Sequence, residues 1–379
     1  MNTDIDKSPD FDVIIAGGGP AGAAAAYYFH FFDRQGLLNI LLIEKKCFED
    51  EYERYHHKCG ECVSKYFLDI IKPIQVKGEE IVAKVKKTRE YWGREPACVS
   101  PTDEYILNRP LFLKSVLRAA EGNGVMVRFD EVIKVINNDS GATVTCKSGF
   151  TAFARMIIGA DGPNSRIRNT CGFDKPQILT AMQYLVPADA TSEPDEIVIW
   201  YDEKYKGGYK YLFSYGEDAR KLGFIHSTDI YQGPVLELQA KQIAMGGLKN
   251  YAKDHVILIG DAAGQANLLT GGGILPAFIA ARELSRSIVN ATKHLKKLQR
   301  TKAFIMATKK FEKWWKHSPY ESRRYISAYN QFAKFSNGDL EKFSLPFRCI
   351  GRLHRVYNLL KNICYWHLYF TMQRAIKYS

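Results

Sequence analysis

The sequence has few cysteines and no recognisable secretion signal. Its eight cysteines among 379 residues form no repeated framework, which excludes a small disulfide-stabilised secreted fold. The single CxxC pair, Cys59–Cys62, has no second pair at zinc-site spacing. The first ten residues carry three aspartates and lack the hydrophobic segment of a signal peptide. We therefore expect a cytoplasmic protein without a metal site.

A membrane-spanning helix is also not expected. Such a helix requires about 20 apolar residues, and the longest uncharged run, 262–281, reaches that length. However, this run contains four glycines and Pro276, and it directly follows a strand pattern and Asp261. We interpret it as a loop and a buried helix under a cofactor.

The amino-terminal pattern predicts a dinucleotide-binding βαβ unit. Residues 11–16 and 39–45 are typical of buried parallel strands, and residues 20–35 are typical of the helix between them. The intervening GGGPAG matches GxGxxG. Its Gly17 permits a tight turn, Gly19 lets the backbone approach a pyrophosphate, and Gly22 allows close helix–strand packing.

An acidic residue follows at the spacing this motif requires. Glu44 ends the second strand, 22 residues after Gly22, near the interval of about 20 expected for a carboxylate that accepts ribose hydroxyl groups. A solvated strand-end carboxylate is the alternative. The neighbouring strand, turn and helix favour dinucleotide binding.

Two further motifs indicate FAD. Residues 157–168 contain GADGxxSxxR, with Asp161 and Gly162 directly after a strand, and residues 256–264 read VILIGDAAG. The strand-end Asp261 can accept hydroxyl groups of a ribityl chain. The amides of Gly272 and Gly273, at a helix start, can hold negative charge on a reduced flavin ring.

In this order, the motifs resemble the flavin-binding fold of the p-hydroxybenzoate hydroxylase type. Within that fold, CGE at 59–61, NRPLF at 108–112 and the segment 243–274 are similar to the geranylgeranyl reductase family, and the similarity covers roughly residues 10–290. The resemblance implies an FAD enzyme that saturates carbon–carbon double bonds of polyprenyl chains. The sequence differs from the family pattern at Leu268, Tyr211 and Ser214, where Pro, Trp and Pro, respectively, are usual.

The resemblance also implies roles for individual residues. Besides the motif residues above, FAD would contact Ala21, Glu44, Cys59, Gly60, Arg109, Val132, Asp261, Gly273 and Ile274. The substrate would face Tyr209, Tyr211 and Phe213. Cys59 is the candidate catalytic residue. A guanidinium at Arg109 suits pyrophosphate or ring oxygens, whereas a surface arginine at a helix start would oppose the helix dipole.

The CGEC segment leaves three interpretations open. Cys59 and Cys62 could form a flavin-coupled dithiol, because a CxxC at a helix start lowers a thiol pKa. They could contribute to a metal site, which two ligands alone disfavour. Alternatively, Cys59 lines the flavin face and Cys62 packs. The preceding pair, His56 and His57, is interpreted as solvated.

We therefore expect an α/β fold: a Rossmann-like FAD-binding domain, a β-sheet substrate-binding layer and a helical C-terminal region. The FAD domain comprises 1–76, 105–172 and 250–300, the substrate layer 77–104 and 173–249, and the C-terminal region 301–379. A helix is expected at 62–72, and 143–146 with 151–158 are expected as hairpin arms.

The predicted function is reduction of isoprenoid double bonds by reduced flavin. A single dinucleotide fold implies an external electron donor, which could be NAD(P)H, a protein or a deazaflavin. The alternative is a flavin monooxygenase acting on an aromatic or lipophilic substrate. A halogenase is disfavoured because the sequence contains no WxWxI motif.

Positive charge is concentrated at the C-terminal end. Residues 283–379 hold 20 Lys and Arg against five acids, a net charge of +15, whereas the whole chain has +12. Seventeen aromatic residues are interleaved with these charges. We expect peripheral docking on an anionic membrane through a face formed by Leu360, Cys364, Tyr365, Leu368 and Met372. Packing of this face on the FAD domain is the alternative, and a nucleic-acid partner is disfavoured.

Overall fold

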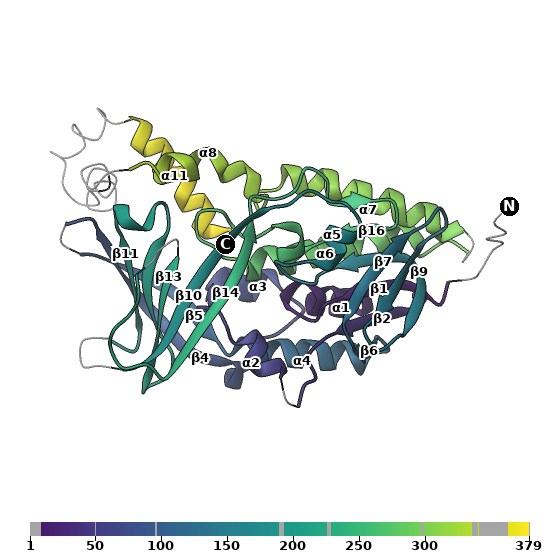
Figure 1. The fold of residues 1–379 in the computed structure, drawn as a ribbon, viewed down its shortest axis with the longest axis horizontal. Helices are drawn as coiled ribbons and strands as arrows, with labels where there is room; N and C mark the ends of the chain where they lie inside the picture. Colours follow the sequence, from purple (N-terminus) through teal and green to yellow (C-terminus); the bar gives the residue numbers. More distant parts are fainter. Residues whose placement is uncertain are drawn as a thin grey trace.

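The computed structural model describes residues 9–49, 51–94, 97–188, 193–225, 229–296, 299–335, 340 and 363–378. These residues form two eight-stranded sheets with helices around them (Figure 1). No helix among the described residues has the length and apolar character needed to cross a membrane.

The first sheet is built on parallel strands in the order β15-β16-β9-β1-β2-β6. Its strands are β1 (Phe11–Ala16), β2 (Ile40–Glu44), β6 (Met126–Phe129), β7 (Val132–Asn137), β8 (Ala142–Cys146), β9 (Thr151–Gly159), β15 (Ala252–Lys253) and β16 (Val256–Leu258). β15 pairs antiparallel with β16, and β7 and β8 join antiparallel beside β9. Strands β1, β9 and β16 all end at one edge, which brings the three glycine motifs together.

Helices cover this sheet on both sides. They are α1 (Pro20–Phe32), α2 (Tyr52–His56), α3 (Lys65–Ile70), α4 (Arg109–Glu121), α5 (Arg166–Thr170), α6 (Ile274–Thr292) and α7 (Arg300–His317). The small residues that open α1 are fully buried, and α1 packs against both α4 and α6. The first sheet and these helices share one hydrophobic core.

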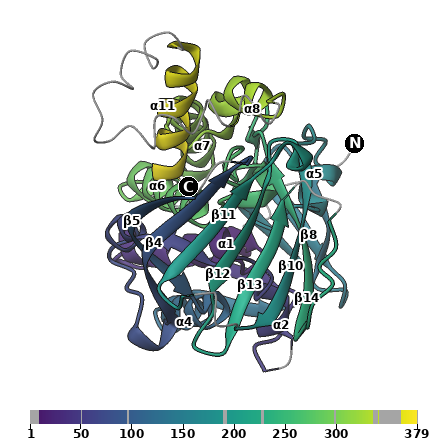
Figure 2. The same ribbon diagram turned by 90° about the vertical axis from the view of Figure 1, so that its left-hand side faces the viewer.

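The second sheet has the order β14-β10-β13-β12-β11-β4-β5-β3. Its strands are β3 (Cys62–Ser64), β4 (Ile81–Trp92), β5 (Cys98–Leu107), β10 (Gln177–Pro187), β11 (Glu196–Tyr201), β12 (Tyr209–Ser214), β13 (Ala219–Ile225) and β14 (Glu237–Met245). All neighbours pair antiparallel except β4 and β11, which are parallel. The long strands stand beside the first sheet in Figure 1, and Figure 2 shows them face-on.

The C-terminal helices α8 (Ile326–Phe332) and α11 (Ile363–Lys377) cover one end of the second sheet. Phe332 contacts the Trp92 ring, and Leu368 and Met372 belong to the same buried cluster. Leu368 and Met372 are only 1% and 5% exposed. The expectation that both insert into a membrane is therefore wrong, because they pack inside the protein. Leu360 lies outside the described residues, as do the side chains of Cys364 and Tyr365.

Two local expectations also need correction. The helix expected over 62–72 begins only at Lys65, because Cys62–Ser64 form β3 and pair with β5. The strand β9 is a hairpin arm with β8, as expected, but it also lies between β1 and β16 as a central parallel strand. Its parallel partners, β1 and β16, are more than 90 residues away in sequence, so no local pattern could indicate them.

Candidate functional site

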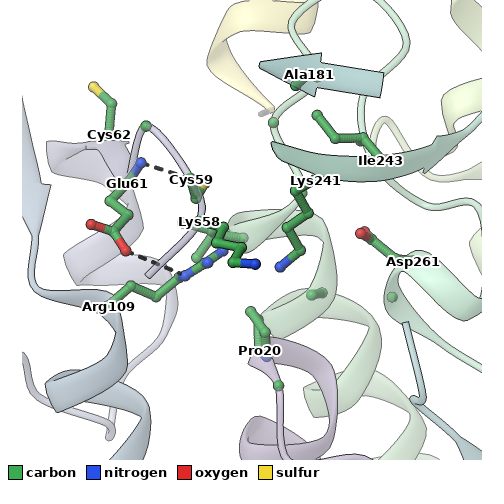
Figure 3. A pocket seen from close by; sticks show the side chains of 18 of the residues that line it. Pro20, Lys58, Cys59, Glu61, Cys62, Arg109, Ala181, Lys241, Ile243 and Asp261 are labelled. Atoms are coloured by element: carbon green, nitrogen blue, oxygen red, sulfur yellow. Dashed lines mark hydrogen bonds and ion pairs between the residues drawn. The ribbon is translucent and has the colours of Figure 1, made fainter. Parts of the chain in front are cut away.

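A cavity of about 620 Å³ lies between the carboxyl edge of the first sheet and the inner face of the second. Its size is that of a cofactor or ligand pocket. Residues of all three glycine motifs line one end, and residues of β4, β5, β11 and β12 line the other. Figure 3 shows the middle of this cavity, where Cys59, Arg109, Lys241 and Asp261 meet.

The GGGPAG loop connects β1 to α1 and places backbone against the cavity. Gly17 has φ +105°, and a β-carbon there would lie 2.4 Å from the Ala160 carbonyl oxygen. A β-carbon on Gly22 would lie 1.7 Å from the Gly17 oxygen. Gly17, Gly19 and Ala21 line the cavity, whereas Gly22 does not. Gly22 therefore serves close packing, as its motif position predicted.

Glu44 lies at the end of β2 and is 3% exposed. Its carboxylate accepts hydrogen bonds from the amides of Gly18, at 2.5 Å, and Lys46, at 2.9 Å. Burial raises the pKa of Glu44, and the bond from Gly18 opposes that shift. Glu44 thus lines the cavity beside the glycine loop while holding that loop in place.

The GADGxxSxxR motif ties two loops together. The Asp161 carboxylate accepts the amides of Arg166 and Ile167, and the Arg168 guanidinium donates to the carbonyls of Ala262 and Pro163. Arg168 therefore fixes the GADG loop to the GDAAG loop. The second Asp161 oxygen, Oδ1, is buried without a hydrogen-bond partner among the described residues. Asp161 and Gly162 line the cavity at this point.

Asp261 and the glycine segment before α6 form the next wall. Asn267 organises this segment, since its side-chain oxygen accepts the amides of Leu269 and Thr270. Asp261, Gly272, Gly273 and Ile274 all line the cavity. A β-carbon on Gly273 would lie 3.3 Å from an Asp261 oxygen. The positive end of α6 and the Asp261 carboxyl therefore face the same space.

The CGE segment is held by a buried ion pair. Lys221, on β13, donates to the Cys59 carbonyl at 3.0 Å and contacts the Glu61 carboxylate, and both charged side chains are fully buried. Glu61 has φ +62°, the left-handed region. A β-carbon on Gly60 would lie 2.8 Å from the Phe213 ring. The second sheet thereby fixes Cys59 and Gly60 at the cavity wall.

Arg109 also anchors this loop. Its guanidinium donates twice to the His56 carbonyl oxygen and lies 3.7 Å from Glu61. Arg109 lines the cavity at the start of α4. Val132, at the start of β7, lines the same end of the cavity.

The two cysteines of CGEC face different surroundings. Figure 3 shows their side chains pointing in different directions. The Cys62 thiol lies 3.2 Å from a Glu104 oxygen, and burial raises its pKa well above the usual range. Both cysteines line the cavity, and the Cys62 thiol is engaged by Glu104 on the neighbouring strand β5. Among the described residues, no cluster of three or more His, Cys, Asp or Glu could hold a metal ion.

His56 is a site residue that the sequence interpretation missed. The expectation of a solvated side chain is wrong, because His56 is 3% exposed and lines the cavity. Its ring stacks on Tyr52 and approaches Gly19, and neither ring nitrogen has a hydrogen-bond partner among the described residues. Burial lowers its pKa well below the usual range, so the ring is neutral and can both donate and accept.

Lys241 is a second missed residue. Its side chain points from β14 toward Lys58 and lies between Arg109 and Asp261 (Figure 3). Burial and then Arg109 lower its pKa to about 8, while Asp261 opposes the shift. The cavity therefore presents positive charge next to the start of α1, which suits an anionic group.

The other end of the cavity has an aromatic wall. Tyr211 and Phe213 stack at 4.3 Å, and all three predicted substrate residues line the cavity. The hydroxyl groups of Tyr209 and Tyr211 donate to the Thr270 carbonyl and to Gln183. Their polar ends are thus occupied, and the rings present apolar surface.

Two carboxyl groups, one buried and one half-buried, interrupt this apolar end. Glu90 and Glu104, on β4 and β5, line the cavity, and burial raises the pKa of both, that of Glu90 to about 7. No sequence motif pointed to either residue, because each is one polar position in a long strand.

Comparisons with known proteins agree with this geometry. The chain is 30% identical to digeranylgeranylglycerophospholipid reductase 1 of Methanopyrus kandleri, over 49% of this chain and 58% of that protein. It is 29% identical to the digeranylgeranylglycerophospholipid reductase of Methanosarcina acetivorans, over 65% of this chain and 68% of that protein. No family model matches the chain.

Solved structures show the same fold. A geranylgeranyl bacteriochlorophyll reductase-like protein of Thermoplasma acidophilum superposes with a TM-score of 0.73 at 22% identity, covering 88% of this chain and 90% of that one. A flavin-dependent brominase superposes with a TM-score of 0.67 at 16% identity, covering 93% and 98%. The fold alone therefore hosts more than one chemistry.

The fold and the three glycine motifs are those of dinucleotide-binding flavoproteins. The sequence relatives reported above are reductases rather than halogenases. Over part of its length, the chain is similar to the geranylgeranyl reductase family of FAD-dependent oxidoreductases.

Proposed function

We propose that the protein binds FAD and reduces carbon–carbon double bonds of an isoprenoid lipid. The observation that carries this proposal is the single cavity in which the nucleotide-binding motifs meet an aromatic wall. The names of the relatives support the substrate class, since both are reductases of a geranylgeranyl lipid.

The residues at the nucleotide end fit FAD. Glycines at positions 17 and 19 let a pyrophosphate approach the start of α1. The buried Asp161 Oδ1 and both His56 ring nitrogens need partners that the described protein residues do not supply. A polar ligand would satisfy them, because buried polar atoms are normally hydrogen-bonded.

We assign the site residues predicted from the sequence as follows. Gly17, Gly19, Ala21, Glu44, Val132, Asp161 and Gly162 would hold the nucleotide half, and Cys59, Gly60, Arg109, Asp261, Gly272, Gly273 and Ile274 would surround the flavin half. Residues 1–76, 105–172 and 250–300 would act as the FAD domain, 77–104 and 173–249 as the substrate layer, and 301–379 as the basic helical region.

When bound, FAD supplies the redox chemistry, and its reduced form carries the hydride for the alkene. The chain's own residues orient the reactants and exclude water. Lys221 and Glu61 fix the loop that carries Cys59, the candidate catalytic residue. The rings of Tyr209, Tyr211 and Phe213 give an isoprenoid chain an apolar surface. An external donor, NAD(P)H, a protein or a deazaflavin, would reduce the flavin.

Anaerobic photoreduction of the purified flavoprotein tests this function. The reduced protein is mixed either with a geranylgeranyl lipid or with oxygen, and flavin absorbance is followed. Rapid reoxidation by the lipid supports the reductase. A hydroperoxide-like absorbance with oxygen and no response to lipid would support the alternative, a flavin monooxygenase of the same fold.

We also propose that this protein works at the cytoplasmic surface of an anionic membrane. The outer face of α7 supports this, since its Lys309 and Lys313 are exposed beside Met306 and Trp314, which are 71% and 41% exposed. Each lysine near an anionic membrane surface contributes about 1 kcal/mol to the free energy of binding. Co-sedimentation with anionic vesicles that weakens with salt is the expected result. No binding at low salt would contradict it.

A further inference from the structure

A second hollow lies beside the main cavity, between β5 and the C-terminal helix α11. One side is formed by Ser64, Lys65 and Tyr66 with residues 101–104, and the other by α11. The α11 residues in this groove are His367, Phe370, Thr371, Arg374 and Lys377. The groove is therefore built from segments at opposite ends of the sequence.

The groove and the main cavity share a wall. Ser64, Pro101, Thr102 and Glu104 line both hollows. The groove and the main cavity are therefore adjacent along these four residues.

The outer part of the groove carries excess positive charge. Lys65 lies 3.4 Å from Asp103, and both of these side chains are about half exposed. Arg374 and Lys377 are exposed, and neither forms an ion pair with a carboxylate of the described residues. Two cations of α11 are thus available to an anionic ligand.

The shared wall is polar but is not strongly charged. Ser64 and Thr102 carry hydroxyl groups, and Glu104 accepts from the Cys62 thiol. Burial raises the pKa of Glu104, and the hydrogen bond from the Cys62 thiol opposes that shift. The two hydroxyl groups can both donate and accept hydrogen bonds. This wall therefore suits ester, ether or hydroxyl oxygens of a ligand.

Helix α11 contributes to both hollows from a fixed position. Met372 lines the main cavity, and Arg374 and Lys377 line the groove. The Asn267 side chain donates to the Ala375 carbonyl at 2.9 Å, so the helix is tied to the glycine segment before α6. At a rise of 1.5 Å per residue, Met372 and Lys377 are about 7.5 Å apart along the axis, roughly the length of a short polar linker.

We propose that this groove binds the phosphate-bearing head of the substrate, with Arg374 and Lys377 as its ligands, while the isoprenoid chain occupies the aromatic cavity. The inference rests on the proposed function for the identity of the chain. It adds where the anionic head of such a substrate would lie, and that the last helix of the protein would hold it. The polar wall of Ser64, Thr102 and Glu104 would lie against the linker between head and chain.

Binding of a matched pair of ligands tests this assignment. Geranylgeranyl monophosphate and geranylgeraniol are compared by equilibrium dialysis of radiolabelled ligand, below their aggregation concentrations and without vesicles. The wild-type holoenzyme should bind the phosphate at least tenfold more tightly. The double variant Arg374→Ala/Lys377→Ala should lose that preference and keep its affinity for the alcohol.

Controls separate a specific site from general charge. The variant Lys302→Ala/Lys310→Ala removes two exposed lysines of α7 and should leave the preference intact. The charge-preserving variant Arg374→Lys/Lys377→Arg should keep much of the preference. Inorganic phosphate should compete only weakly, because it lacks the chain. Strong competition by inorganic phosphate would instead indicate a free-anion site.

The outcomes also separate this inference from the proposed function. Equal affinities of the wild type for the phosphate and the alcohol would overturn the head-group site, even if both ligands are reduced. An equal loss of the preference for the phosphate in the α7 and α11 alanine variants would overturn it as well. A preference for the phosphate that disappears only in the α11 variant would support the site even if neither ligand reoxidises the flavin.

Discussion

The two ends of the central cavity are constructed differently. The nucleotide end is formed mainly by backbone in three short motifs, where glycines let loops approach one another and a ligand. The substrate end is formed by side chains from β4, β5, β11 and β12 and from α11, which are far apart in the sequence. A backbone site tolerates little change, whereas a side-chain site can change specificity through single residues. The predictions below test this difference, beginning with the largest expected effect.

Adding a side chain to the backbone end should prevent correct folding. In Gly22→Val, the β-carbon would lie 1.7 Å from the Gly17 oxygen, so the loop or α1 must move. We expect destabilisation by about 4 kcal/mol or more, measured by urea unfolding, or insoluble protein. Gly78→Ala is the control, since a β-carbon there meets nothing within 4 Å. Equal stability of the two variants would show that the close approach is unimportant.

Removing the Asp261 carboxyl should remove most of the bound flavin. Asp261 faces the cavity beside Gly273, and a hydrogen bond to such a group is worth about 1.5–3 kcal/mol. Purified Asp261→Ala should therefore be largely colourless, as judged by flavin absorbance per protein. Asp69→Ala, at an exposed position, should stay yellow. A yellow Asp261→Ala at wild-type occupancy would refute the cofactor placement.

The buried carboxyl group at the substrate end should make stability depend on pH. Burial raises the pKa of Glu90 from 4.5 to about 7. The protonated carboxyl group therefore contributes fully to the free energy of unfolding below pH 4.5, and this contribution is lost as the pH rises through 7. At 1.36 kcal/mol per pKa unit, the loss is about 3 kcal/mol. Glu90→Gln should lose less stability than the wild type between pH 5 and pH 8 in urea unfolding. The exposed Glu79→Gln should follow the wild type; parallel curves for all three proteins would contradict the prediction.

His56 should contribute a smaller amount to flavin affinity. Its two ring nitrogens are buried at the glycine loop without partners among the described residues, so a bound dinucleotide could supply one. One such hydrogen bond is worth about 1 kcal/mol, and His56→Ala should weaken FAD binding roughly five- to tenfold in a fluorescence titration. His317→Ala, at an exposed position, should not change the affinity. An unchanged affinity in His56→Ala would mean that the ring only packs.

The same difference explains what the sequence could predict. The glycine motifs are contiguous, and their chemistry follows from their spacing. The sequence alone therefore indicates Glu44, Asp161 and Asp261 as candidate site residues. The parallel pairing of β1 with β2 also follows from βαβ connectivity. These features need no knowledge of distant contacts.

The substrate end could be predicted only in part. A family motif indicates Tyr209, Tyr211 and Phe213. In contrast, Glu90, Glu104 and Lys241 are single polar residues in strands. Because strand side chains alternate between the two faces of a sheet, the sequence pattern would equally fit solvent-facing positions for these three. His56 lies in a segment rich in charged residues, 49–58, whose pattern does not indicate burial. Leu368 and Met372 formed an apolar helical face, whose partner is the second sheet and could not be identified from helical spacing.

Product analysis of a single turnover tests the central claim most directly. Photoreduced enzyme is mixed anaerobically with one equivalent of a geranylgeranyl lipid, and the lipid is analysed by mass spectrometry while flavin oxidation is recorded. The account predicts that each flavin oxidised adds two hydrogen atoms to one lipid double bond. Flavin that stays reduced, or that is oxidised while the lipid mass is unchanged, would contradict it.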